Sequence, residues 1–189
     1  TQGIECCLPP SDDGDTGLCV ALTDASAERS FITHVGAEGV LQTTDLQHEM
    51  ATEEDWVMVS GYSLLHAGKA APLLAWLQQG GAAGALVFDP GPLACNPDIP
   101  GAEQLLERLA IWSSNREEAL QFTAADDMEQ ALERLTARLP EDALVILRDG
   151  PQGCWLARGD WRLQIPGFAV EAVDTNGAGD AHIGVFLAS

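Results

Sequence analysis

The closing stretch of the chain, VDTNGAGDAHIGVFLAS (173–189), contains residues suited to holding an anion. Gly177 and Gly179 flank Ala178 and are followed by Asp180 and an apolar segment. Glycine permits backbone conformations that a β-carbon obstructs, and the helix that follows leaves its first N–H groups unpaired, so an anion can dock there. The spacing therefore predicts an oxyanion or phosphate pocket built from backbone N–H groups.

Asp180 is expected in or beside the first turn of that helix, where the helix dipole favours an ionised carboxylate. Beside an anion pocket, its useful partner is a hydroxyl that it deprotonates while N–H groups hold a phosphoryl group in transfer. A structural interpretation also fits: Asp174 or Asn176 caps the helix, and the glycines only let the turn form. Spacing alone leaves both interpretations open.

Two other phosphate-binding motifs do not match the sequence. A P-loop requires Gly-Lys followed by Ser or Thr, and the chain has no such tripeptide. The dinucleotide fingerprint requires a third glycine, and His182 stands at that position. A P-loop nucleotide-binding protein and a Rossmann-type oxidoreductase are therefore disfavoured.

Composition limits the partners of the protein. The 189 residues are 46% hydrophobic, enough for a substantial core, and 29 acidic against 9 basic residues give a formal net charge of −20. This charge repels nucleic acid and anionic lipid, whereas a small anion can still be held by N–H groups and a metal ion. We therefore expect neither a nucleic-acid partner nor a membrane partner.

The cysteines indicate a reducing compartment. They number five, with no CxxC pair and no histidine at a metal-ligand spacing, and they stand at positions 6, 7, 19, 95 and 154. An odd total and an adjacent pair that cannot easily bridge favour free thiols. Because neither a secretory signal nor a membrane-spanning run is evident, we expect a cytoplasmic protein.

Strands alternate with helices along most of the chain. Strand-like segments lie at 16–24 and 28–36 (a hairpin or ribbon), 55–62, 84–92, 111–115 (a short strand or loop), 142–150 and 153–165 (a hairpin). Helical segments lie at 66–81, 102–110, 117–123 and 126–140. This alternation predicts an α/β layered fold with a mostly parallel sheet covered on both faces.

The loops that follow the predicted strands are expected to share one edge of the sheet. In such folds, ligands lie beyond the carboxyl ends of the strands. The corresponding positions are 61–63, 89–92, 114–118, 148–153 and 174–180.

The closing motif DTNGAGD (174–180) resembles the signature Asp-Thr-x-Gly-Ala-Gly-Asp of the ribokinase-like, PfkB-type carbohydrate kinases. Five further segments resemble elements of that family in the same order. They are the lid strands (16–38), VSGY (59–62), the Asp-Pro segment FDPGP (88–92), the Asn-x-x-Glu element NREEA (115–119) and the Thr/Lys-x-Gly-x-x-Gly element RDGPQG (148–153).

The resemblance implies a ribokinase-like three-layer αβα sandwich with a small β-strand lid. The lid strands would occupy about 16–36 and the α/β core about 50–189. The family's N-terminal strand and sugar-binding residues would precede residue 1, and its adenine-pocket segment would follow residue 189. The chain is therefore expected to be an internal part of a kinase domain, inactive by itself.

The resemblance also implies an activity: transfer of the γ-phosphoryl group of ATP to a hydroxyl of a sugar or nucleoside. Asp180 would be the general base, and Gly177, Ala178, Gly179 and Asp180 would supply the anion hole. The implied cofactors are ATP and Mg²⁺, with K⁺ as the monovalent cation that many members hold.

The remaining site residues follow from the same resemblance. Asn115 and Glu118 would organise Mg²⁺ and its waters near the phosphates. The nucleotide would be lined by Arg148, Gly150 and Gly153. Asp174 and Asn176 fall where many members hold the monovalent cation.

Three positions depart from the family pattern. Arg148 replaces the usual threonine or lysine, His182 replaces the usual aromatic residue, and Glu38 stands where ribokinases often have asparagine. The first two lie near the expected nucleotide contacts and the third near the acceptor, so these contacts are expected to differ in detail.

The ribbon at 16–36 has too little core to stand alone. We therefore expect it to cover the acceptor or to pair with the same ribbon of a second subunit, giving a homodimer. A non-catalytic sugar- or nucleotide-binding protein of the same fold is the alternative to the kinase.

Overall fold

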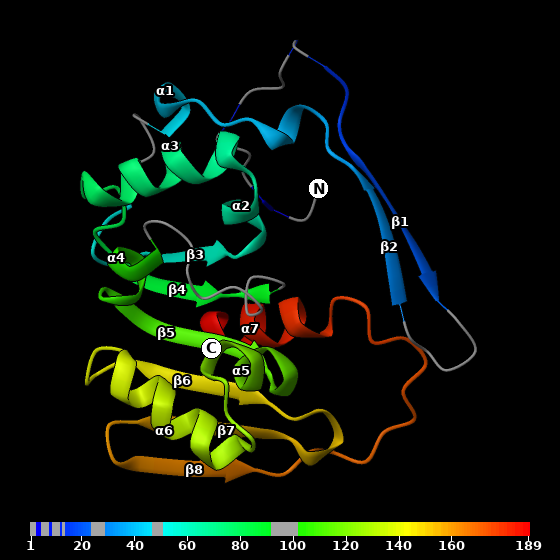
Figure 1. Cartoon of the computed structure of the whole chain (residues 1–189), viewed down its shortest axis with the longest axis vertical. Helices are drawn as coiled ribbons and strands as arrows, with labels where there is room; N and C mark the ends of the chain where they lie inside the picture. The colour runs from blue at the N-terminus through cyan, green and yellow to red at the C-terminus, as the bar shows by residue number, and fades with distance from the viewer. Residues whose placement is uncertain are drawn as a thin grey trace.

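The computed structural model describes residues 14–23, 29–46, 51–91 and 102–189, together with residues 3, 4, 8 and 12. Strands β1 (Leu18–Thr23) and β2 (Arg29–His34) form an antiparallel two-stranded sheet, here called the ribbon. Figure 1 shows the ribbon standing to one side of the helices and the main sheet. The predicted pairing is confirmed, while the connection at 24–28 lies outside the described residues.

The main sheet has six strands in the order β3-β4-β5-β6-β7-β8. Its parallel strands are β3 (Trp56–Ser60), β4 (Ala85–Asp89), β5 (Leu109–Asn115) and β6 (Leu144–Arg148). An antiparallel hairpin of β7 (Cys154–Arg158) and β8 (Trp161–Ile165) completes one edge. The predicted mostly parallel sheet is confirmed, and the predicted hairpin at 153–165 extends that same sheet.

Seven α-helices occur among the described residues. They are α1 (Thr43–Leu46), α2 (Tyr62–Leu65), α3 (Ala67–Gln78), α4 (Ala102–Leu106), α5 (Arg116–Thr123), α6 (Met128–Arg138) and α7 (Ala178–Ala188). Two short 3₁₀ turns are η1 (Ala37–Gly39) and η3 (Gly150–Gln152). None of the helices in the described ranges has the length and apolar character needed to cross a lipid bilayer.

The predicted helix at 102–110 is too long. Helix α4 ends at Leu106, and Leu109 begins β5, where it pairs with Leu86 of β4. The turn between them is held by Arg108, whose guanidinium donates to the carbonyl oxygens of Leu77 (2.6 Å) and Ala82 (2.9 Å). These tertiary bonds override the local helical pattern.

Alternate residues of each central strand face opposite layers, as the period of a strand requires. In β6, Val145 and Leu147 pack in the larger core, beneath α3, α4, α5 and α6. Leu144 and Ile146 pack on the other face, where Ile183 of α7 covers them. Arg148 is the next residue of this second row, which directs its side chain toward α7.

Helix α7 covers the centre of its face but leaves both edges exposed. Met58 of β3 lies beside Val87 on that face, and Leu163 of β8 lies opposite Leu156. The exposed hydrophobic side chains along these two edges are Trp56, Met58, Trp161, Leu163 and Ile165. The helices α3–α6 therefore cover more of one face of the sheet than α7 covers of the other, and Gln164 of the edge strand β8 remains exposed on the first face.

Gly61 brings the ends of β3 and β4 together. Its N–H donates to the carbonyl oxygen of Asp89 at 2.7 Å. A β-carbon at this position would overlap the carbonyl oxygen of Pro90, so only glycine permits this approach. The contact places Tyr62 and Asp89 at the same edge of the sheet.

Candidate active site

The carboxyl ends of the parallel strands and the start of α7 enclose a cavity of about 370 Å³, here called the strand-end cavity. Its lining consists of Met58, Ser60, Tyr62, Asp89, Gly91, Asn115, Glu118, Arg148, Thr175, Asn176, Gly177, Ala178, Gly179 and Asp180. Most of the residues predicted from the sequence are thus brought together. Gly150, Gly153 and Asp174 are not in this lining.

Gly177 shapes the start of α7. It occupies the N-cap position in the left-handed conformation, with φ 72° and ψ 6°. No heavy atom lies within 4 Å of where its β-carbon would be, so glycine is required by conformation and not by space. Because the N-cap is a glycine, the helix is not capped there by Asp174 or Asn176; the Asp174 carboxylate instead accepts the N–H of Asn176 at 2.8 Å.

Gly179 has a different role. A β-carbon there would lie 3.3 Å from Nη2 and 3.5 Å from Cζ of Arg148. The guanidinium of Arg148 therefore packs directly against the turn, and a larger residue at 179 would press on it. The two glycines of the motif thus serve separate purposes, one for backbone shape and one for close approach.

Arg148 crosses the floor of the cavity. Its Nη2 lies 3.2 Å from Asp89 Oδ2 and 3.9 Å from Glu118 Oε2, and its Nη1 donates to Ser113 Oγ. The side chain is only 14% exposed. From β6 it therefore spans β5 and reaches the end of β4.

The two carboxylates beside Arg148 lie in a weakly solvated environment. Burial raises the pKa of Asp89, although the Arg148 charge and the Gly91 N–H oppose this rise. Burial also raises the pKa of Glu118, and the negative charge of Asp89 adds to it while the N–H of Asn115 opposes it. Their side chains are 16% and 20% exposed. Both carboxyls would gain from a cation placed between them.

Asn115 and Glu118 form a capping box at the N-terminus of α5. The Glu118 N–H donates to Asn115 Oδ1, and the Asn115 N–H donates to Glu118 Oε2, both at 2.8 Å. This pair fixes the direction of the Glu118 carboxylate. Because its amide oxygen already accepts a backbone N–H, Asn115 is better suited to orient Glu118 than to ligate a metal.

The site suits Mg²⁺ held partly through water. Mg²⁺ is usually bound by one or two carboxylates together with substrate phosphates and waters. Asp89 and Glu118 supply such a pair, and no group of three or more His, Cys, Asp or Glu residues suited to a metal occurs in the described part of the chain. These two residues would hold the ion, with phosphates completing its shell.

Three residues of this region were not predicted as site residues. Asp89 is the last residue of the buried strand β4, and the sequence pattern placed the segment 89–92 at the edge of the sheet without indicating a role for this carboxylate. Ser113 is fully buried on β5 and contacts Arg148. Tyr62 lines the cavity, and burial together with the charge of Glu118 raises its pKa.

His182, one of the departures from the family pattern, is a half-buried residue of α7 itself. Its Nδ1 is buried and has no hydrogen-bond partner among the described residues. Burial and the charge of Arg148 lower its pKa, which favours a neutral imidazole.

The glycines of the predicted nucleotide element lie in different surroundings. Gly153 has φ 93°, and its β-carbon would overlap the carbonyl oxygen of Ile165, so it is needed for packing against the end of β8. Gly150 has φ 52° and no heavy atom within 4 Å of its β-carbon position. Only Gly150 therefore leaves open space beside the backbone for a ligand.

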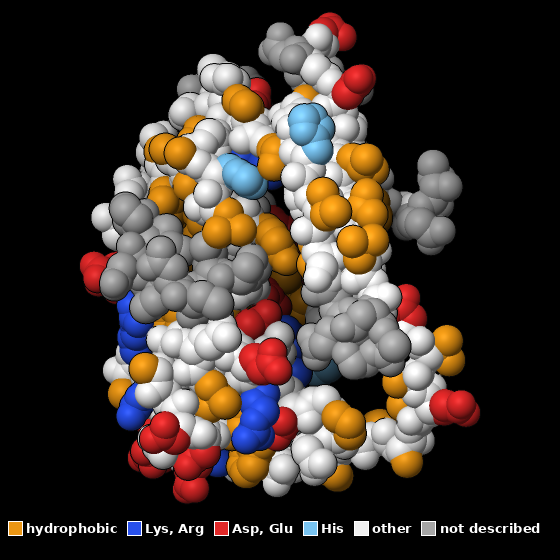
Figure 2. Space-filling model, turned by 45° about the vertical axis from the view of Figure 1, so that its right-hand side comes forward, with side chains coloured by type: hydrophobic (Ala, Val, Ile, Leu, Met, Phe, Trp, Pro, Cys, Tyr) orange, Lys and Arg blue, Asp and Glu red, His pale blue; other side chains and the backbone are white. Residues whose placement is uncertain are grey.

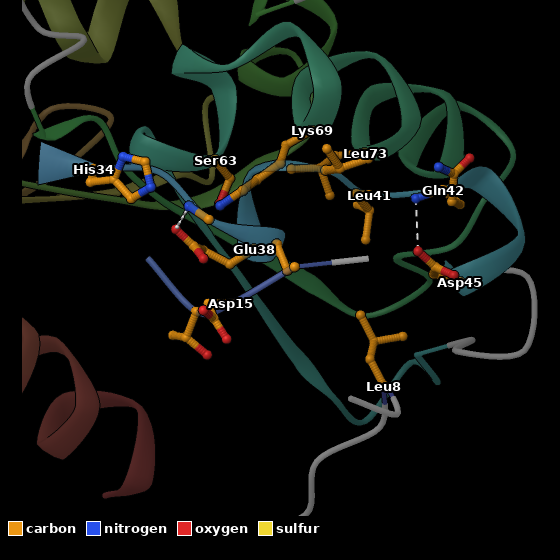
Figure 3. Close-up of a pocket in the computed structure, with 15 residues that line it drawn as sticks. Leu8, Asp15, His34, Glu38, Leu41, Gln42, Asp45, Ser63, Lys69 and Leu73 are labelled. Carbon is orange, nitrogen blue, oxygen red and sulfur yellow. Dashed lines mark hydrogen bonds between the residues drawn. The ribbon is translucent and has the colours of Figure 1, made fainter. Parts of the chain in front are cut away.

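A second, larger cavity of about 1220 Å³ lies at the base of the ribbon (Figure 3). Its central carboxylate, Glu38, accepts the N–H groups of Gly17 (2.7 Å) and Gly36 (3.0 Å). These bonds lower the pKa of Glu38, with a smaller effect from Lys69, which reaches toward it from α3. Ser63 lines this second cavity, and the preceding residue, Tyr62, lines the strand-end cavity. Figure 2 shows the hollow between the ribbon and the body of the molecule.

Relatives of known sequence cover the chain almost from end to end. The uncharacterized sugar kinase YegV of Escherichia coli is 32% identical over 186 residues, which are 93% of this chain and 55% of YegV. The probable fructokinase-5 of Arabidopsis thaliana is 27% identical over 88% of this chain and 53% of its own length. The chain thus spans about half the length of these relatives.

Solved structures share the fold. The adenosine kinase of Sinorhizobium meliloti matches 95% of this chain with a TM-score of 0.78 and 22% identity, over 56% of its own length. The fructokinase of Vibrio cholerae, solved with fructose, ADP and calcium, matches 89% with a TM-score of 0.71 and 20% identity, over 57% of its length. The ribokinase-like α/β fold predicted from the sequence is therefore confirmed.

A protein-family profile also matches the sequence. The profile described as pfkB family carbohydrate kinase matches residues 1–189. Together with the assembled glycine turn and the strand-end carboxylates, this match shows that the chain belongs to the pfkB family of carbohydrate kinases.

Proposed function

We propose that the protein is an ATP-dependent kinase that transfers the γ-phosphoryl group to a hydroxyl of a sugar or nucleoside. One observation carries this proposal: the Gly-Ala-Gly turn, Asp180 and the half-buried pair Asp89 and Glu118 all line one cavity. An anion site, a base and a metal-suited carboxylate pair are the parts that phosphoryl transfer requires. Because the chain spans about half the length of its relatives, the activity is proposed for the whole protein.

Asp180 is proposed as the general base. It lies exposed in the first turn of α7, at the cavity, where it is free to accept a proton from an acceptor hydroxyl. The N–H of Ala178 donates to the carbonyl oxygen of Thr175 at 3.2 Å, so the N–H groups of Gly179 and Asp180 in this first turn would hold the oxygens of the phosphoryl group. Gly177 sets the direction of these N–H groups.

Asp89 and Glu118 are proposed to hold Mg²⁺. When bound, the ion would neutralise the phosphates of the nucleotide and help orient them. The Asn115 capping box fixes the position of Glu118, and the Gly91 N–H donates to Asp89 Oδ1 at 3.1 Å. The directions of both carboxylates are therefore fixed by backbone N–H groups.

The acceptor is proposed to lie between Asp180 and the ribbon. The second cavity, at the base of the ribbon, contains polar groups suited to hydroxyls, including Asp15, Ser63 and Lys69. The fructose in the Vibrio cholerae fructokinase supports a sugar in this class of site. The segment around Asp174 and Asn176 is proposed for a monovalent cation such as K⁺, and Gly150 for a nucleotide contact.

The test is phosphoryl transfer by the complete protein that contains this chain. Purified protein would be incubated with ATP, Mg²⁺ and a panel of hexoses, pentoses and nucleosides, with phosphorylated product identified by mass spectrometry. We expect ADP release that depends on an acceptor and is lost in Asp180→Asn. Nucleotide or sugar binding without transfer to any acceptor would instead establish the non-catalytic binding protein.

A further inference from the structure

The strand-end cavity contains an unusual balance of charge. Among the described residues that line it, Arg148 is the only Lys or Arg, whereas three carboxylates are present, those of Asp89, Glu118 and Asp180. Two of these carboxylates lie within 4 Å of the same guanidinium nitrogen. The cation therefore sits at the place where the proposed metal ion would find its protein ligands.

Arg148 is held in this position from several sides. Ser113 accepts from Nη1, Asp89 and Glu118 approach Nη2, and Gly179 leaves room for the guanidinium plane against the turn of α7. The aliphatic part continues the row of Leu144 and Ile146 beneath α7. A buried arginine with these partners is a fixed feature of the site and not a mobile surface side chain.

We propose that Arg148 is a built-in counter-cation that competes with a divalent metal for Asp89 and Glu118, so that the metal binds well only together with nucleotide phosphates. This inference rests on the proposed function. In the absence of ligand, the guanidinium compensates two half-buried carboxylates that are only partly solvated. A divalent cation placed at the same carboxylates is repelled by the arginine over a few ångströms in a weakly screened site.

Nucleotide phosphates change this balance. Their negative charges offset the repulsion between the metal and Arg148, so a metal–nucleotide complex is accepted where the bare metal is not. The guanidinium is also a preferred partner of phosphate oxygens and already lies against the proposed anion turn. Arg148 thereby favours entry of metal and nucleotide as one unit.

The experiment measures binding of Mn²⁺ alone, without nucleotide, by electron paramagnetic resonance of the free ion. Arg148→Met removes the competing charge and keeps much of the side-chain volume. We expect Mn²⁺ to bind the Met variant about tenfold more tightly, or more, than the parent protein. Arg148→Lys retains the charge and should stay near the parent affinity.

The matched control is Arg116→Met. Arg116 is 47% exposed and pairs with Asp149 at 3.1 Å, and it does not line the cavity, so its replacement changes net charge equally without touching the site. Its Mn²⁺ affinity should stay within about twofold of the parent. Circular dichroism checks folding, and Arg148→Gln replaces the Met variant if that variant does not fold.

Unchanged or weaker Mn²⁺ binding in a folded, neutral Arg148 variant would overturn the proposal, since a purely structural arginine predicts loss of the site. Tighter binding in both Arg148→Met and Arg116→Met would also overturn it, because general charge would then be the cause. The kinase proposal is judged separately, from transfer by the parent protein. A protein without transfer whose Arg148→Met variant binds Mn²⁺ more tightly would reject the kinase and retain the competition.

Discussion

The floor of the strand-end cavity and the ribbon differ in how their side chains are held. The floor is cross-linked by side chains from neighbouring strands: Arg148 from β6 meets Ser113 on β5 and Asp89 at the end of β4. The ribbon has hydrophobic residues exposed along both strands and stands to one side of the main sheet (Figure 1). The proposed chemistry therefore belongs to a cross-linked frame, whereas the proposed coverage of the acceptor belongs to an element that exposes hydrophobic residues.

The exposed hydrophobic residues of the ribbon are Leu18, Val20, Leu22, Phe31 and Ile32, and Figure 2 shows hydrophobic side chains gathered on one of its faces. Val20 pairs with Ile32, whereas the neighbouring pair, Cys19 and Thr33, lies on the opposite face. Leu18 and Leu22 lie on the same face as Val20 and Ile32, because alternate residues of a strand share a face. We therefore propose this face for pairing with a second subunit.

The largest expected effect tests the rigid region. Asp180→Asn is nearly isosteric and leaves the anion turn intact, but an amide cannot accept the acceptor's proton. We expect kcat of the complete protein to fall by about 10²- to 10⁴-fold with ATP binding retained. If turnover stayed near normal while only thermal stability fell, Asp180 would be a helix-end charge and not a base.

The next prediction tests the ribbon. Val20→Lys places a charge on the face proposed to meet a second subunit, so we expect the dimer to dissociate at micromolar concentration, with its Kd raised by more than about thirtyfold. Analytical ultracentrifugation of the complete protein measures this. Val170→Lys, an exposed valine outside the ribbon, is the matched control and should leave the dimer intact. A parent protein that is already monomeric and active would refute ribbon pairing.

A third prediction returns to the floor and concerns Mg²⁺ and pH. Because the pKa values of Asp89 and Glu118 are raised, protons compete with the metal at pH values above the ordinary carboxyl range of about 4. The Mg²⁺ concentration for half-maximal rate should therefore rise as pH falls toward this range. Glu118→Gln should raise that concentration about tenfold at neutral pH.

The control for this third prediction is Glu117→Gln, which changes an exposed carboxylate on the same helix. The contribution of Asp89 and Glu118 to the free energy of unfolding should increase as pH falls, whereas their affinity for Mg²⁺ should decrease. A raised folded-state pKa contributes stability that is present at low pH and lost as pH rises through that pKa. Mg²⁺ dependence that is identical in the Glu118 and Glu117 variants would place Glu118 outside the metal site.

The smallest effect is expected at the base of the ribbon. Glu38→Gln keeps the size of the side chain but replaces one of its two charged acceptor oxygens with an NH₂ group, so one of the bonds from Gly17 and Gly36 is lost. We expect limited proteolysis within 16–36 to accelerate by less than about fivefold, with global unfolding little changed. Because the bonds lower the pKa of Glu38, the parent should show the same acceleration on acidification. Equal cleavage of both proteins at every pH would exclude this role.

The sequence predicted the sheet better than it predicted the contacts across it. The strands at 84–92 and 142–150 were found because continuous apolar runs mark strands buried on both faces. The boundary between α4 and β5 was missed because Leu106 and Leu109 are both buried, at a spacing that also suits a helix. Local periodicity does not separate these cases.

In the candidate site, too, features that are local in sequence were predicted better than contacts between strands. The anion turn was predicted because its residues are adjacent in sequence and their chemistry is local. The partners of Arg148 were not predicted, because they depend on β4, β5 and β6 being neighbours and on which face each residue takes. Asp89 and Arg148 are 59 residues apart and meet only through that strand order. Neither the sequence around Asp89 nor the sequence around Arg148 indicates that these two residues meet.

The double hydrogen bond to Glu38 has a mechanical consequence. Because it holds Gly17 and Gly36 together, it joins the two strands at the base of the ribbon, so that the ribbon can pivot as one stiff unit. Six paired residues per strand give the ribbon a length of about 20 Å. A rotation of about ten degrees at the base would then move the far end of the ribbon by about 3.5 Å, roughly the thickness of one layer of atoms. A small rearrangement around the Glu38 carboxylate would thus produce a displacement large enough to admit or trap a small molecule.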